Sequence, residues 1–80
     1  MRRSVLLFGR YAELFGTETV SVDLPDGATV ADLIAALRAL PGGASLPSQP
    51  FVAVAQAQAT PDDRLPPDAE LALLPPLAGG

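Results

Sequence analysis

A single amphipathic stretch in the middle of the chain, residues 29–40, limits the folds that are open to these 80 residues. Thr29 is a favourable N-cap, and Asp32 three residues later completes the pattern of a capping box. Pro41 and the two glycines after it predict the end of the helix. The apolar side chains recur at helical spacing, and they are Val30, Leu33, Ile34, Leu37 and Leu40. A helix with one apolar face must pack on another element, and a chain this short builds only one core.

The segments before this helix predict two strands and a short helix. Residues 4–8 are a dense apolar run, which is typical of a strand that is buried on both faces and central in a sheet. Residues 10–15 have helical character, and Gly16 suits the position after a helix. The apolar side chains expected on one side of this short helix are Tyr11, Leu14 and Phe15. Residues 19–24 alternate between apolar and polar side chains, which predicts a half-buried strand.

Two further strands are predicted after the main helix. Residues 51–57 contain valines alternating with small side chains, which predicts one strand. Residues 70–74 predict the last strand, with Leu71 and Leu73 on one face and Leu74 on the other. This order of elements predicts an α+β fold, a roll in which a mixed sheet of four to five strands is covered on one face by the long helix.

The composition excludes several kinds of chemistry. The sequence contains no Cys, no His and no Lys. A disulfide framework, a thiolate nucleophile, an imidazole base, a Ser-His-Asp triad, a Schiff base and a P-loop lysine are therefore excluded. Five basic residues against nine acidic ones give a net charge of −4, which argues against a nucleic-acid partner.

Neither a membrane or signal segment nor a metal site is expected. The apolar run at residues 5–8 is too short for a signal peptide or a membrane span, so we expect a soluble, cytoplasmic protein with no membrane partner. Asp62, Asp63, Asp68 and Glu70 lack the spacing of an EF-hand loop, and we interpret them as turn residues, so no metal site is predicted.

The chain ends in Pro75-Pro76-Leu77-Ala78-Gly79-Gly80, directly after the last predicted strand. Because prolines cannot donate to a sheet ladder, the strand is expected to end here and an extended segment to begin. Six extended residues at about 3.1 Å each reach about 19 Å. A frayed terminus and a functional tail both fit these residues.

This tail, the order of the elements and residues 8–16 resemble the MoaD/ThiS family of ubiquitin-like sulfur carriers, most closely its MoaD branch of molybdopterin synthase small subunits. The most specific motif is Pro75-Pro76-x-x-Gly79-Gly80 after a strand in so short a chain. Residues 52–56 also match a family segment, although family members commonly have Asn where Ala55 stands. The other departures from the family pattern are Ala12, where relatives often have Arg, and Leu73 and Leu74, where relatives tend to have aromatic side chains.

The resemblance implies a β-grasp domain over residues 1–74 and an extended tail over residues 75–80. It implies that a MoeB-like activating adenylyltransferase adenylates the carboxylate of Gly80, which a sulfur donor system then converts to a thiocarboxylate. The chain itself would bind no cofactor, because ATP and Mg are used by the activating partner. The residues that would enter the large subunit of molybdopterin synthase, a MoaE-like protein, are Pro75, Pro76, Leu77, Ala78 and Gly79.

Within that synthase the thiocarboxylate would donate sulfur to a cyclic pyranopterin precursor of molybdopterin, in molybdenum cofactor biosynthesis. The chain would act as a co-substrate, with the catalytic groups on the large subunit. Phe8 and Leu74 are expected on the sheet face opposite the helix if Leu71 and Leu73 face it. An exposed apolar face beside the tail would be a docking surface, and the resemblance places the large subunit there.

Two alternatives stay open. The same thiocarboxylate could serve another recipient, in the formation of the thiamin thiazole, of cysteine or of thiolated tRNA. The chain could also be a ubiquitin-like interaction module, or a modifier that is conjugated to lysines of other proteins. A pure binding module has no need of a free Gly-Gly end, so the tail distinguishes that alternative from the carriers.

Overall fold

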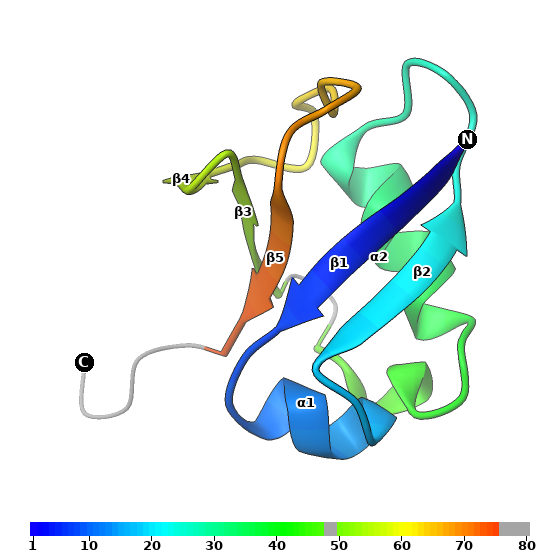
Figure 1. Cartoon of the computed structure of the whole chain (residues 1–80), viewed down its shortest axis with the longest axis vertical. Helices are drawn as coiled ribbons and strands as arrows, with labels where there is room; N and C mark the ends of the chain where they lie inside the picture. The colour runs from blue at the N-terminus through cyan, green and yellow to red at the C-terminus, as the bar shows by residue number, and fades with distance from the viewer. Residues whose placement is uncertain (48–49, 76–80) are drawn as a thin grey trace.

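The computed structural model of the chain describes residues 1–47 and 50–75. The elements follow one another around a single sheet (Figure 1). They are β1 (Arg2–Leu7), α1 (Arg10–Phe15), β2 (Thr19–Asp23), α2 (Val30–Arg38), the 3₁₀ turn η1 (Gly43–Ser45), β3 (Phe51–Val54), β4 (Ala57–Gln58) and β5 (Leu71–Leu74).

The sheet has five strands in the order β2-β1-β5-β3-β4. The central pair, β1 and β5, is parallel, and all the other pairs are antiparallel. Helix α2 lies across one face of this sheet, behind the strands in Figure 1. The predicted α+β roll, with a mixed sheet and one main helix, is therefore confirmed, and its arrangement is that of a β-grasp domain.

Helix α2 begins where the sequence predicts. The side-chain oxygen of Thr29 accepts a hydrogen bond from the Asp32 backbone N–H at 3.3 Å, and the Asp32 carboxylate accepts one from the Thr29 N–H at 2.9 Å. Both halves of the capping box are thus present. Four of the five predicted apolar positions are buried against the sheet, namely Val30, Leu33, Ile34 and Leu37, and Leu40 is half-buried beside them.

The prediction of one strand over residues 51–57 is confirmed only for its first part, because β3 ends at Val54. The chain forms a hairpin instead, in which β3 pairs with the short strand β4 through a turn at Ala55 and Gln56. Both turn residues have left-handed backbone angles, with φ of 52° and 68°. The turn was missed because neither position is Gly, Asn or Asp, which normally mark a turn of this kind, and the small side chains continue through it.

The predictions for the N-terminal third need two smaller corrections. Strand β1 runs from Arg2 to Leu7, so Phe8 follows the strand, and Leu6 is half-buried on the face that was predicted to be fully buried. In α1, Tyr11 is buried and Phe15 packs on the core, but Leu14 is exposed. Three apolar positions are too many for the narrow contact that a helix of six residues makes with the core.

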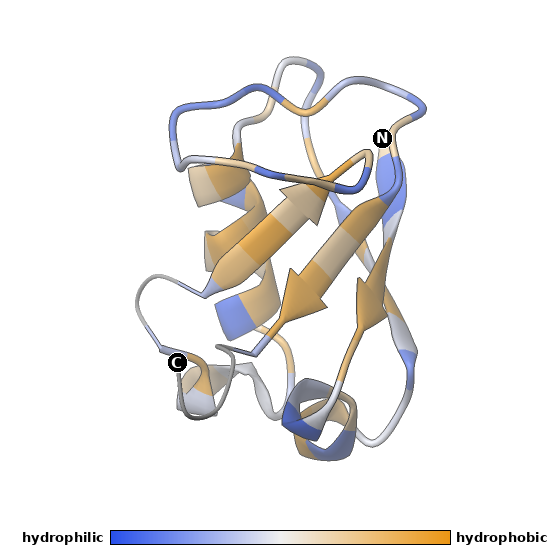
Figure 2. Cartoon of the chain, turned by 90° about the vertical axis from the view of Figure 1, so that its left-hand side faces the viewer, coloured by the Kyte–Doolittle hydropathy of each residue, from blue (hydrophilic) through white to orange (hydrophobic). Residues whose placement is uncertain are grey.

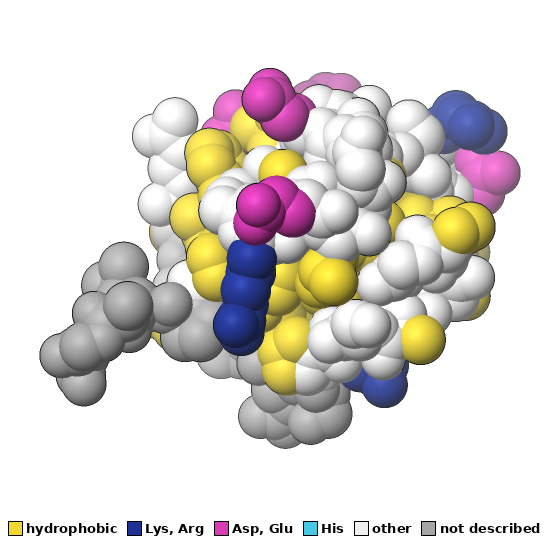
Figure 3. All heavy atoms as spheres, turned by 90° about the horizontal axis from the view of Figure 1, so that it is seen from below, with side chains coloured by type: hydrophobic (Ala, Val, Ile, Leu, Met, Phe, Trp, Pro, Cys, Tyr) yellow, Lys and Arg dark blue, Asp and Glu magenta, His cyan; other side chains and the backbone are white. Residues whose placement is uncertain are grey.

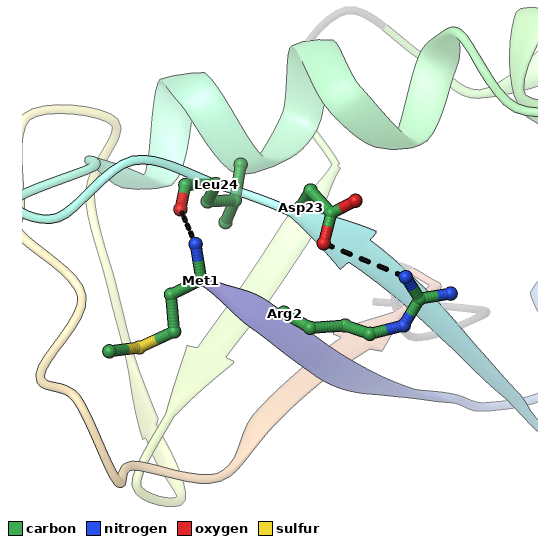
Figure 4. Close-up of polar contacts among 4 residues, drawn as sticks. All are labelled: Met1, Arg2, Asp23 and Leu24. Carbon is green, nitrogen blue, oxygen red and sulfur yellow. Dashed lines mark hydrogen bonds and ion pairs between the residues drawn. The ribbon is translucent and has the colours of Figure 1, made fainter.

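The first residues of β1 are held to the end of β2 (Figure 4). The Met1 ammonium group donates to the Leu24 carbonyl at 2.6 Å, and the Leu24 N–H donates to the Met1 carbonyl at 2.8 Å. Beside them, the Arg2 guanidinium lies 3.6 Å from the Asp23 carboxylate, with both side chains largely in solvent. The backbone bonds extend the ladder by one residue, whereas an ion pair this exposed adds little to stability.

Candidate functional site

The C-terminal segment leaves the molecule from the middle of the sheet. Strand β5 lies between β1 and β3, and it pairs with β1 in parallel, so that both strands end at the same edge. The Phe8 N–H donates to the Leu73 carbonyl at 3.2 Å, which carries the ladder one step past β1. Pro75 follows β5 directly. The other predicted tail residues lie outside the described residues, and they are Pro76, Leu77, Ala78, Gly79 and Gly80.

The sheet face that points away from α2 is apolar beside this exit. We call it the outer face. Its strand residues alternate with the buried core residues, and they are Leu6, Phe51, Ala53, Ala72 and Leu74. We include Phe8, which directly follows β1 and continues its ladder with β5. In Figure 2, β5 and β3 are coloured as hydrophobic, and β1 is so coloured toward its C-terminal end. By contrast, β2 contributes Thr19 and Ser21 to the same side, so the apolar surface stops at this strand.

The two residues that the sequence predicted for docking both belong to the outer face. Phe8 is 45% exposed, and Leu74 is half-buried while its neighbours Leu71 and Leu73 are fully buried. The predicted division of β5 between the two sheet faces is therefore confirmed. Whether a partner binds there stays a prediction.

One aromatic residue of the outer face was missed. Phe51 lies directly opposite Leu74 in the β3–β5 register and is 44% exposed. The signal was present in the sequence, because an inward Val52 requires an outward Phe51 in a strand. Phe8, Phe51 and Leu74 together place three large apolar side chains beside the point where the C-terminal segment begins.

The charged side chains lie around this surface. Arg10 and Glu13 are exposed on α1, at the end of the molecule where β1 and β5 also finish. Figure 3 shows this end, with apolar side chains exposed between the charged ones.

Within residues 1–47 and 50–75, no group of three or more carboxylates is placed to hold a metal ion. No helix in the same part of the chain has the length and apolar character needed to cross a bilayer.

Such a surface is suited to binding and not to acid–base chemistry. Every outer-face side chain named above is apolar, and none is an acid or a base. The model of the ThiS family matches residues 5–80. This chain belongs to the ThiS family. The match extends to Gly80, so the terminal glycines are part of it.

Solved structures of ThiS-like fold agree with this membership. Small archaeal modifier protein 1 (SAMP1) of Haloferax volcanii is 29% identical to the chain, with a TM-score of 0.81 and 100% of both chains covered. A candidate molybdopterin converting factor subunit 1 of Pyrococcus furiosus is 22% identical, with a TM-score of 0.81 and coverage of 96% of this chain and 99% of that one.

A further similar structure is a protein–protein complex. It contains subunits 1 and 2 of the molybdopterin-converting factor of Helicobacter pylori, and the match is 21% identical with a TM-score of 0.69 over 100% of both chains. No curated protein sequence matches the chain. The structural matches establish the β-grasp fold, and the family match establishes a sulfur-carrier-like chain.

Proposed function

We propose that this chain is the sulfur carrier of molybdopterin synthesis, the small subunit of a molybdopterin synthase. The observation that carries the proposal is the family match through Gly80, on a chain whose last strand ends at Leu74 beside an exposed apolar face. The resemblance of the sequence to the MoaD branch supports the choice of recipient.

The reaction needs activation because a terminal carboxylate, with a pKa near 3.5, is ionised and a poor electrophile. The Gly80 carboxylate attacks the α-phosphate of ATP, and pyrophosphate leaves. Sulfide-level sulfur from the donor system then attacks the acyl carbon as HS⁻, and the C–S bond forms as the C–O bond to AMP breaks, which leaves a thiocarboxylate. The thiocarboxylate sulfur bonds to the pterin precursor as a thioester, and water then cleaves the C–S bond to Gly80, so that sulfur stays on the pterin and Gly80 regains its carboxylate. Because a dithiolene holds two sulfur atoms, two charged carriers serve each product.

The residues of this chain fit the role of a co-substrate. Gly79 and Gly80 have no side chain that would obstruct a narrow channel, and Pro75-Pro76 restricts the free conformations of the segment, so less entropy is lost on insertion. ATP and Mg belong to the MoeB-like adenylyltransferase in this proposal.

We place the contact with a MoaE-like large subunit on the outer face. Phe8, Phe51 and Leu74 present the large apolar side chains there, and the face ends at the strand that continues into the C-terminal segment. A partner that covers this face receives the segment at the same time. The Helicobacter pylori complex, between proteins named as subunits 1 and 2 of one factor, supports a partner of this kind.

A second candidate function is protein modification. Two structures of SAMP1, named a small archaeal modifier protein, are 29% and 28% identical to the chain, against 22% and 21% for the two molybdopterin converting factor matches. The chain has no Lys, so it cannot accept an isopeptide bond on a lysine of its own. As a modifier it would only donate its C-terminus to another protein.

The position of the sulfur tests the proposal. The chain is incubated with a MoeB-like adenylyltransferase, ATP and a sulfur donor, alkylated with a thioacid-selective label, and fragmented. The label is expected on the C-terminal fragment and should be lost when Ala is added after Gly80. Intact mass alone is not sufficient, because replacing oxygen by sulfur adds nearly the same mass as oxidation of Met1, the only methionine.

The recipient is tested separately. The charged carrier, mixed with a MoaE-like subunit and the pyranopterin precursor, should yield the dithiolene product. Mass that maps to Met1, or conjugates to proteins without any thiocarboxylate, would refute the carrier role and favour the modifier.

A further inference from the structure

The parallel pair β1–β5 brings two backbone segments together just beyond the sheet. Leu7 is paired with Leu73, and the Phe8 N–H still bonds to the Leu73 carbonyl at 3.2 Å. Two residues past that pair, Gly9 meets Pro75. Gly9 precedes α1, while Pro75 is the first residue after β5 and is half-buried.

No side chain fits at residue 9 without moving Pro75. A Cβ atom built on Gly9 would lie 3.0 Å from the Cγ of the Pro75 ring and 3.6 Å from its Cδ. The shorter distance is well inside the usual contact separation of about 3.5–4.0 Å between carbon atoms. The Pro75 ring therefore occupies the space that a side chain at residue 9 would need.

The backbone conformation of Gly9 also requires glycine. Its φ of 58° and ψ of −135° lie close to the first central position of a type II′ turn, which is a region that L residues rarely adopt. Gly16, at the other end of α1, has a positive φ of 73° too, but a Cβ there would meet nothing within 4 Å. The two glycines thus share a left-handed φ, and only Gly9 touches the start of the C-terminal segment.

We propose that Gly9 is a positioning residue for the C-terminal segment, because its bare backbone seats the Pro75 ring and so sets the direction in which the chain leaves the sheet. This inference rests on the proposed function, in which the reacting carbon of Gly80 must reach a partner's active site. The proline ring fixes its own φ, so a seated ring fixes the first step of the segment. A displacement at Pro75 therefore changes the point and the direction from which the rest of the chain continues.

The test compares Gly9→Ala with Gly16→Ala in ATP–pyrophosphate exchange by a MoeB-like adenylyltransferase, below the unfolding temperature of both variants. Gly9→Ala should lower kcat about tenfold with little change in KM, because it misdirects the segment without touching the outer face. Gly16→Ala should stay within about twofold of the wild type. Because Ala is more strained in the backbone conformation of Gly9 than in the αL conformation of Gly16, a further variant is needed to separate the contact from strain.

Pro75→Ala separates the contact from backbone strain, since it removes Cγ and Cδ, the two atoms that a Cβ at residue 9 would meet. Alone it should lower kcat about threefold through added freedom of the segment. The double variant Gly9→Ala/Pro75→Ala should match Pro75→Ala alone. Equal kcat in Gly9→Ala and Gly16→Ala, or a tenfold loss that persists in the double variant, would overturn the inference. An unchanged kcat in Pro75→Ala would also overturn the inference. This variant does not introduce the backbone strain that could unfold Gly9→Ala.

A measurement without any partner keeps the two proposals apart. The NMR amide shifts of residues 77–80 should move in Gly9→Ala, stay in place in Gly16→Ala, and take the Pro75→Ala values in the double variant. Absence of exchange with the wild-type chain would refute the proposed function alone. Shifts that do not follow this pattern would refute the positioning role alone.

Discussion

The left-handed turn between β3 and β4 predicts an unusual gain of stability. Gln56 is exposed and has a φ of 68°, a conformation that costs a residue with a side chain about 1–2 kcal/mol. Gln56→Gly removes this cost and gives up little contact, but adds about 0.5–1 kcal/mol of entropy loss on folding. The expected net effect is a rise of about 1 kcal/mol in the free energy of unfolding. In a domain of this size that raises Tm by about 4–8 °C.

The chain offers a matched control two residues later. Gln58 is also exposed, but it lies within β4 and pairs with Ala53, so Gln58→Gly should lower the free energy of unfolding by about 0.5–1 kcal/mol. Thermal and urea unfolding of the two variants and the wild type measure the difference. A lower Tm for Gln56→Gly as well as for Gln58→Gly would refute the reasoning, because it would mean that residue 56 does not have a left-handed conformation in solution.

Leu74→Glu should weaken binding to a MoaE-like subunit by about 2–5 kcal/mol in calorimetry while leaving the free chain folded. The control Thr19→Glu, on the polar part of the same sheet side, should bind nearly as well as the wild type. Unfolding of the free Leu74→Glu chain would place Leu74 in the core instead. Thr29→Ala breaks the capping box and should cost about 1 kcal/mol in urea unfolding, so an unchanged midpoint would contradict the cap. The buried Tyr11 hydroxyl has no hydrogen-bond partner among the described residues, so Tyr11→Phe should be neutral or slightly stabilising. A loss above about 1 kcal/mol would show that the hydroxyl has a partner.

The parts of the fold that the sequence predicts correctly are those where local chemistry and burial agree. In α2, the cap at Thr29 and the spacing of the apolar side chains point to the same helix, and both are present. Gly16 closes α1 with a positive φ, as a glycine in that position should. In β5, alternation alone separates Leu73, which is buried, from Leu74 on the outer face.

Two of the features that were missed depend on contacts that no local pattern records. The turn at Ala55 and Gln56 has no residue that favours a left-handed backbone, so its conformation follows from the pairing of β3 with β4 and with β5. The Ala55 N–H donates to the Glu70 carbonyl at 2.8 Å, a bond between residues far apart in the sequence. The contact of Gly9 with Pro75 likewise depends on the parallel register of β1 and β5, which the sequence does not specify.

The sulfur recipient, unlike the fold, is not indicated by the side chains of this sequence. In the proposed reaction the reacting group is the backbone carboxylate of Gly80, which every chain possesses, so no catalytic side chain could reveal the substrate in this sequence. In this proposal, one carrier therefore differs from another in the surface that its partner binds. Leu74 lies on the outer face and is bonded to Pro75, so in the proposed function the same strand would present the docking surface and continue toward the reactive end. A partner that recognises the outer face thereby selects the chemistry, and exchanging the apolar residues of that face between carriers should exchange their recipients while the tail stays the same.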